Sequence, residues 1–147
     1  MIIDTHAHYD DEQFDEDRES LLAKMKNAGI GIIVNAGSTI SSWEKIRKLT
    51  KEYPFIYGAV GVHPDEAGTL NEEQMARMSV FLDEEKIVAL GEIGLDYYWD
   101  KESRDLQKKW FIRQLDLARE KNMPVIIHSR EACLLYTSPS PRDSTSC

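Results

Sequence analysis

Apolar and polar positions along the chain alternate between two patterns, one typical of buried strands and one typical of amphipathic helices. Short apolar runs rich in β-branched residues are bounded by glycine, proline or charged residues, and they predict buried strands. The predicted strands are 2–8, 30–36, 55–62, 87–90 and 125–127. Between them, apolar residues recur every three or four positions and predict helices. The predicted helices are 14–28, a second around 43–49, 72–82 and 102–121.

This strict alternation of strand and helix decides the fold class. All-apolar strands separated by helices indicate a parallel sheet covered on both faces, with right-handed crossovers. The pattern ends after Ala132, because 133–147 is rich in serine, threonine and proline and has no apolar periodicity. We therefore expect one α/β unit over 1–132. The tail is either a natural disordered segment or non-native sequence translated at a truncated end, and we favour the second interpretation.

Composition narrows the class of protein. A chain of 147 residues suits one domain, no apolar run is long enough to span a membrane, and nothing at the start resembles an export signal. We therefore expect a cytoplasmic protein. Both cysteines, Cys133 and Cys147, lie in the tail, so the main body has no disulfide framework. The net charge of −8 argues against a broad basic surface for nucleic acid. A phosphate substrate stays compatible with it, because bound divalent cations supply local positive charge.

The histidines and one glutamate carry the candidate chemistry. His6 and His8 stand two residues apart on one predicted strand, so both imidazoles lie on the same face. His63, Glu92 and His128 follow three other predicted strands. A single histidine at a strand end is usually structural. In a parallel α/β protein, however, functional groups gather where strands end, and this common placement favours a shared metal cluster.

Several neighbouring residues have two possible roles each. His63 either contacts substrate or makes a loop hydrogen bond, and Arg130 either meets a phosphate or forms a surface ion pair. Asp4 could orient a histidine ring, and Asp96 could orient a ring or cap its loop. The aromatic run 97–99 either stacks a base or packs the rim.

Four segments resemble the TatD-type metal-dependent deoxyribonucleases, in order and over about residues 1–132. They are DTHAH (4–8), GVHP (61–64), GEIGLDY (91–97) and PVIIHSR (124–130). The resemblance implies a TIM-type (β/α)8 barrel of roughly 260 residues, here truncated to about five strands. It also implies hydrolysis of DNA phosphodiester bonds, as a 3′–5′ exonuclease, with two divalent cations of Mg, Mn or Zn.

The resemblance also assigns roles to residues. It implies that His6 and His8 bind one cation, that Glu92 bridges both as the catalytic carboxylate, and that His128 binds the other. Such cations polarise the phosphoryl oxygen and lower the pKa of a bound water. The implied partner is DNA or another phosphodiester, with no protein partner evident and no membrane.

The departures from the family pattern are as informative as the matches. The family also uses a histidine after strand six and an aspartate after strand eight, and the aspartate acts as the general base. This chain has neither, so we expect an enzymatic parent and an inactive fragment. Two alternatives stay open. One is a related barrel hydrolase of amide or ester bonds, which would commonly carry a lysine in place of Glu92. The other is a poorly folded fragment without catalytic function.

Overall fold

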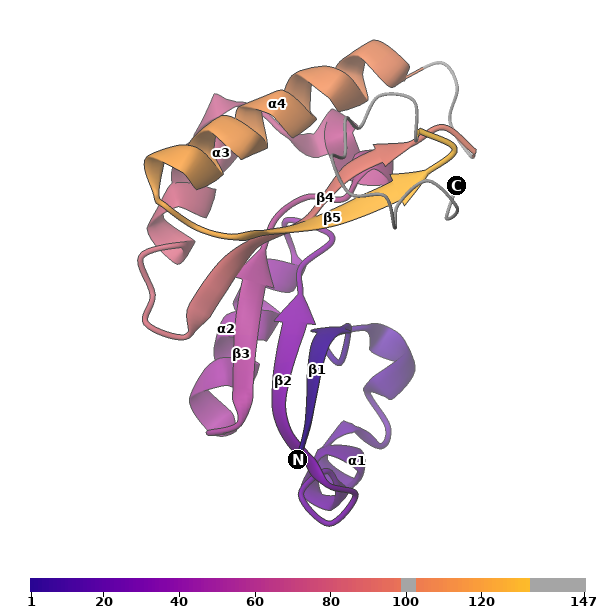
Figure 1. Cartoon of the computed structure of the whole chain (residues 1–147), viewed down its shortest axis with the longest axis vertical. Coiled ribbons are helices and arrows are strands. Elements are labelled where there is room, and N and C mark those ends of the chain that lie inside the picture. The colour runs from indigo at the N-terminus through magenta and orange to yellow at the C-terminus, as the bar shows by residue number, and fades with distance from the viewer. Residues whose placement is uncertain (99–102, 133–147) are drawn as a thin grey trace.

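A computed structural model describes residues 1–98 and 103–132 (Figure 1). Five strands alternate with four α-helices, as the apolar pattern predicts. In chain order they are β1 (Ile2–Ala7), α1 (Arg18–Lys24), β2 (Ile30–Ala36), α2 (Ser42–Glu52), β3 (Ile56–Val60), α3 (Glu72–Phe81), β4 (Ile87–Asp96), α4 (Arg104–Glu120) and β5 (Val125–Arg130). Two short 3₁₀ helices, η1 (Glu12–Phe14) and η2 (Pro64–Thr69), follow β1 and β3. The predicted tail 133–147 lies outside the described residues.

The strands form one parallel sheet in the order β1-β2-β3-β4-β5. Each strand pairs with the next one in sequence, which is the connectivity of a barrel wall. Helices pack along the sheet, with α2 against β3 and α4 against β4 and η2 (Figure 1). The predicted fold class is confirmed: the chain forms five strands of a TIM-type barrel. Among the described residues, no helix is long and apolar enough to cross a membrane.

The core holds the strand ends in position. Its larger cluster joins α2, α3 and α4 to β3 and β4, and Trp43 is completely buried within it. The indole Nε1–H of Trp43 donates to the carbonyl oxygen of Gly61 at 2.9 Å, and its ring packs edge-on against Phe81. Because Gly61 lies two residues before His63, this contact fixes the chain just ahead of a candidate site residue.

Several predicted boundaries were wrong. Strand β5 runs to Arg130 and not to 127, so His128 lies within the strand and does not follow it. The first helix is shorter than 14–28, because the segment begins as a separate 3₁₀ turn and α1 buries only Leu22 along its length. Strand β4 extends six residues beyond the predicted end at Leu90 and continues to Asp96. A register shift between Leu90 and Ile93 lets it go on pairing with β5, and every position from 89 to 97 is buried. Glu92 therefore lies inside a strand rather than in the following loop.

Gly94 explains how β4 and β5 approach so closely. Its φ of +154° lies in the region that favours glycine, and a Cβ there would overlap the carbonyl oxygen of His128. The absence of a side chain at Gly94 therefore permits the close approach of the neighbouring strand.

Candidate metal centre

Glu92 is the central residue of the candidate site, and its side chain is only 9% exposed. Its Oε2 lies 3.1 Å from His6 Nε2 and 3.5 Å from His8 Nε2. Its Oε1 lies 3.1 Å from His128 Nδ1. Each carboxylate oxygen therefore faces a different set of imidazole nitrogens.

The first set belongs to β1 and the residue after it. His6 Nε2 and His8 Nε2 are 3.2 Å apart. His8 Nδ1 lies 2.9 Å from the carbonyl oxygen of Ala36 at the end of β2. A carbonyl only accepts, so Nδ1 must donate its proton there, and the Nε2 atom of the neutral ring keeps a free lone pair. The fold thus presents His8 in the tautomer that a ligand needs.

The second set surrounds His128 on β5. His128 Nε2 lies 2.9 Å from Asp96 Oδ2, and its ring packs edge-on against His63 at 4.2 Å between centroids. Ligand atoms of His63, Glu92 and His128 all lie within 4.8 Å of one another. His63 Nδ1 also accepts the backbone N–H of Asp65 at 3.3 Å, which caps η2. The loop hydrogen bond predicted for His63 is therefore present, in a position beside the centre.

The residues of the cluster shift one another's pKa values. Burial alone would raise the pKa of Glu92, but hydrogen bonds from His128 and His8, with charge from His6 and His63, hold it well below its usual range. The pKa of His8 and that of His128 are raised mainly by hydrogen bonding to Glu92, although burial opposes both shifts. Burial and the nearby charge of His128 lower the pKa of His63. Without a cation, Glu92 therefore favours a second proton on His8 and on His128.

The distances fit a first coordination shell. Nitrogen and oxygen ligands lie about 2.0–2.2 Å from zinc, so neighbouring ligands in a tetrahedral or octahedral shell are roughly 3.0–3.5 Å apart. The separations among His6, His8 and Glu92 are 3.1, 3.2 and 3.5 Å. Both the donor chemistry and the spacing fit a divalent cation.

Asp96 and Asp4 differ in what they contact. Asp96 fills both roles considered for it, because Oδ2 meets the His128 ring and Oδ1 accepts the backbone N–H of Tyr98 at 3.0 Å. Asp4 Oδ1 instead accepts the backbone N–H of His6 at 3.1 Å. Asp4 therefore supports the strand and not a ring in the structure.

The remaining predicted residues lie at the rim. The guanidinium of Arg130 lies 4.3 Å from the centroid of the Tyr98 ring, and Tyr98 is 46% exposed. Tyr97 is buried beside Leu95 and Ala132, which fits rim packing. Trp99, the third aromatic residue of that run, lies outside the described residues.

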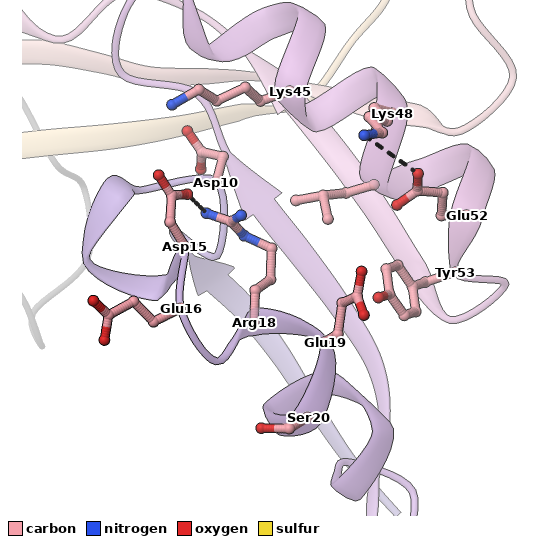
Figure 2. Close-up of a pocket in the computed structure, with 11 residues that line it drawn as sticks. Asp10, Asp15, Glu16, Arg18, Glu19, Ser20, Lys45, Lys48, Glu52 and Tyr53 are labelled. Atoms are coloured by element: carbon pink, nitrogen blue, oxygen red, sulfur yellow. Dashed lines mark hydrogen bonds and ion pairs between the residues drawn. The ribbon is translucent and has the colours of Figure 1, made fainter.

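One hollow adjoins the cluster, and a second one shares a lining residue with the first. The first, of about 310 Å³, opens onto the cluster and is lined by His8, Asp10, Asp11, Gln13, Ser38, His63 and Glu92. A larger one of about 570 Å³ lies between α1 and α2 and also includes Asp10 (Figure 2). Four of its charged side chains form ion pairs, Arg18 with Asp15 and Lys48 with Glu52. With five acidic and three basic residues in its lining, the larger hollow is net acidic.

Sequence reasoning missed the residues that support the site. Gln107 and Gln114 of α4 are buried and hydrogen-bond the backbone of Asp96 and Val62. A signal existed, because both glutamines share the spacing of Trp110 and Leu117 on the buried helix face. A polar residue at an apolar position of a helix indicates a buried partner.

The fold and the site together define a barrel protein with a histidine–carboxylate centre where parallel strands end. The sequence model of the family described as TatD related DNase matches residues 3–137, and the chain belongs to that family. It is 42% identical over 132 residues to the uncharacterized metal-dependent hydrolase YabD of Bacillus subtilis, covering 90% of this chain and 52% of that protein. It is 33% identical over 131 residues to the 3′-5′ ssDNA/RNA exonuclease TatD of Cronobacter sakazakii, covering 89% and 50%.

A solved structure gives the same result for the fold. The crystal structure of the TatD homologue YjjV from Escherichia coli superimposes with a TM-score of 0.84 at 32% identity, covering 91% of this chain and 52% of that one. The chain spans about half the length of the curated relatives it matches.

Proposed function

We propose that this chain is the cation-binding half of a metal-dependent hydrolase that cleaves phosphodiester bonds in DNA. One observation carries the proposal: the two oxygens of Glu92 face His6 and His8 on one side and His128 on the other, at 3.1–3.5 Å. A carboxylate that faces two groups of imidazoles is arranged to bridge two cations. The ligand set is therefore His6, His8, Glu92 and His128, with Glu92 as the catalytic bridge.

The chain's own residues would bind the cations and orient the histidine rings. Ala36 and Asp96 fix the proton positions of His8 and His128, and the burial of Glu92 keeps competing water away from its carboxylate. Bound divalent cations supply a polarised phosphoryl oxygen and a bound water of lowered pKa. The imidazole ligands suit zinc or manganese, and the phosphate substrate suits magnesium or manganese.

Two observations support nucleic acid as the substrate class: the net charge of the chain and the name of one relative. With a net charge of −8, the chain needs local cations to attract a polyanion. His63 packs against the His128 ring, and Arg130 lies two residues after His128 on β5. These two are the substrate contacts we propose. A relative named a 3′-5′ ssDNA/RNA exonuclease supports nucleic acid as the substrate and the exonuclease mode. A cytoplasmic location fits this role.

The 147 residues alone are proposed to bind cations but to turn over little substrate. We place the barrel half in residues 1–132, and all the ligands proposed above lie within it. In the family pattern, a further histidine and the general-base aspartate come from later strands. Full activity therefore belongs to the longer protein.

Two measurements test the proposal. Titration of the metal-free chain with Zn²⁺ and Mn²⁺ should give up to two cations per chain, with one lost in His6→Ala. Glu73, an exposed residue of α3, gives the control Glu73→Ala, which should bind as the wild type does. Absence of binding in folded wild-type protein would refute the centre.

In the second measurement, the longer protein is assayed on single-stranded DNA, a simple phosphodiester, a carboxylic ester and an amide. Cleavage of only the last two would refute the substrate class.

A further inference from the structure

A buried glutamine on α4 clamps the backbone of Asp96. The backbone N–H of Asp96 donates to Gln107 Oε1 at 2.9 Å, and Gln107 Nε2 donates to the carbonyl oxygen of Asp96 at 2.9 Å. The second proton of Nε2 reaches Ser103 Oγ at 3.0 Å. Gln107 is 1% exposed. All of its amide hydrogen-bonding groups are used, so the amide has one orientation and Asp96 is held from both sides.

The side chain of Asp96 is equally constrained. It is 1% exposed, its Oδ1 accepts the N–H of Tyr98 at 3.0 Å, and its Oδ2 lies 2.9 Å from His128 Nε2. The carboxylate reaches the imidazole from β4, while His128 comes from β5. Residue Asp96 thus connects the helix clamp to the ring across two strands.

The contact determines which nitrogen of His128 carries a proton. Both ring nitrogens face a carboxylate, but the contact to Asp96 is the shorter one, 2.9 Å against 3.1 Å to Glu92, and Gln107 holds Asp96 in place. We therefore assign the proton of the neutral ring to Nε2 and the lone pair to Nδ1. That lone pair points at Glu92 Oε1, 3.1 Å away. Two acceptors at this distance repel unless a positive group lies between them. The arrangement resembles the carboxylate–histidine–metal triads in which an outer carboxylate orients a ligand.

We propose that Asp96, held by Gln107, is the positioning residue that fixes the His128 ring and presents its Nδ1 to a cation shared with Glu92. The proposal deepens the proposed function and rests on it for the cation. It assigns α4, which contributes no ligand of its own among the described residues, the task of setting one ligand's tautomer.

The same helix offers a matched control. Gln114, two turns further along α4, is 2% exposed and clamps Val62 in the same way: it accepts the Val62 N–H at 2.9 Å and donates to the Val62 carbonyl at 3.2 Å. Val62 precedes His63 and is not bonded to Asp96. Gln114→Leu therefore removes an equivalent buried clamp from the same helix without touching the Asp96–His128 contact.

Nitrogen NMR of the ¹⁵N-histidine-labelled, metal-free chain tests the proposal directly. Spectra are recorded well above the pH at which the rings titrate, and the His128 signal is identified by its loss in His128→Gln. Wild type and Gln114→Leu should carry the proton on Nε2. In Asp96→Asn the amide group can donate to Nε2, so the proton should move mainly to Nδ1. Gln107→Leu should give a mixture of the two tautomers.

Cation affinity gives the second readout. Zn²⁺ should bind Asp96→Asn about 10- to 100-fold more weakly than the wild type, as expected for loss of a group that orients a ligand. An unchanged His128 tautomer and unchanged affinity in both Asp96→Asn and Gln107→Leu would overturn the role of Asp96 while leaving the metal centre intact. Absence of Zn²⁺ binding by the wild-type chain would overturn the proposed function instead, so the two failures are distinguishable.

Discussion

His8 and Ala36 are linked across neighbouring strands: the Nδ1 atom of His8 lies 2.9 Å from the carbonyl oxygen of Ala36, at the end of β2. Strand β2 therefore sets the tautomer of a residue that follows β1. Because Nδ1 donates its proton to this carbonyl oxygen, a second proton and a cation compete for the remaining nitrogen, Nε2. The competition leads directly to a pH dependence.

Cation affinity should rise with pH. Hydrogen bonding to Glu92 raises the pKa of His8 and His128, so both hold a second proton at a higher pH than a free histidine does. A cation must displace these protons, and binding should weaken as pH falls through the raised values. Calorimetry in buffers of different ionisation enthalpy should detect proton release. Affinity that is constant across this range would contradict the assignment of these rings as ligands.

The metal-free chain should be most stable in mild acid. His8 and His128 have raised pKa values, so their contribution is complete below their ordinary value of 6.5 and is lost as pH rises through the folded-state values. Glu92 has a lowered pKa, so its contribution is present above its ordinary 4.5 and is lost in stronger acid. Urea denaturation across pH should show a maximum between these limits. Saturating Zn²⁺ should move that maximum to higher pH.

Glu92→Gln should weaken cation binding by about 100-fold or more, because it removes the charge that both groups of histidines share. The raised pKa values of His8 and His128 should also fall, since their hydrogen bonds to a carboxylate are lost. Histidine titrations by NMR would report this shift. Glu73→Gln on the exposed face of α3 is the control, and an equal effect there would show that the loss is not specific to the centre.

Trp43→Phe should destabilise the chain by about 1–3 kcal/mol. The substitution leaves a cavity and removes the hydrogen bond to the carbonyl oxygen of Gly61. Urea denaturation measures the change in the free energy of unfolding. Val80 is 68% exposed on the neighbouring helix, so Val80→Ala should cost about 0.5 kcal/mol or less. Similar losses in both variants would contradict the structural role of Trp43.

Gly94→Ala should destabilise the chain by about 3 kcal/mol and weaken cation binding. A Cβ at this position would overlap the carbonyl oxygen of His128, and the φ of +154° adds backbone strain. β5 would have to shift and carry His128 away from Glu92. At Gly68 an added Cβ would find its nearest neighbour 4.0 Å away, so Gly68→Ala should change stability little. A well-tolerated Gly94→Ala would show that the strands can separate there without cost.

Much of the fold was predictable, because the strands are apolar runs and the helices show a clear apolar period. The limits of β4 were not, since Gly91 and Gly94 have the appearance of a loop in sequence. They permit close pairing with β5, which depends on a neighbour distant in sequence. The separation of η1 from α1 was also missed, because Phe14 fits the helical spacing but lies outside the helix.

The candidate site, like the fold, was predictable where neighbouring residues in the sequence determine it and not where residues distant in sequence do. Four histidines and Glu92 were placed together from their positions at strand ends. Asp96 was considered as a residue that orients a ring, but Ala36 was not, because it contributes only a backbone carbonyl. Gln107 was also missed, since its task depends on how α4 packs over β4. The helical period can mark Gln107 as buried, but which residue it contacts follows only from three-dimensional packing.

The centre also has a mechanical consequence that follows from the strand order. β1 and β5 are the two outermost strands of the described sheet, yet His6 and His128 meet at Glu92 on the central side of β4. Two cations held by these histidines and joined through Glu92 would connect the two edges of the sheet and resist its flattening. The ligands would then set the curvature of the barrel wall, and loading with metal would stiffen the whole arc of strands.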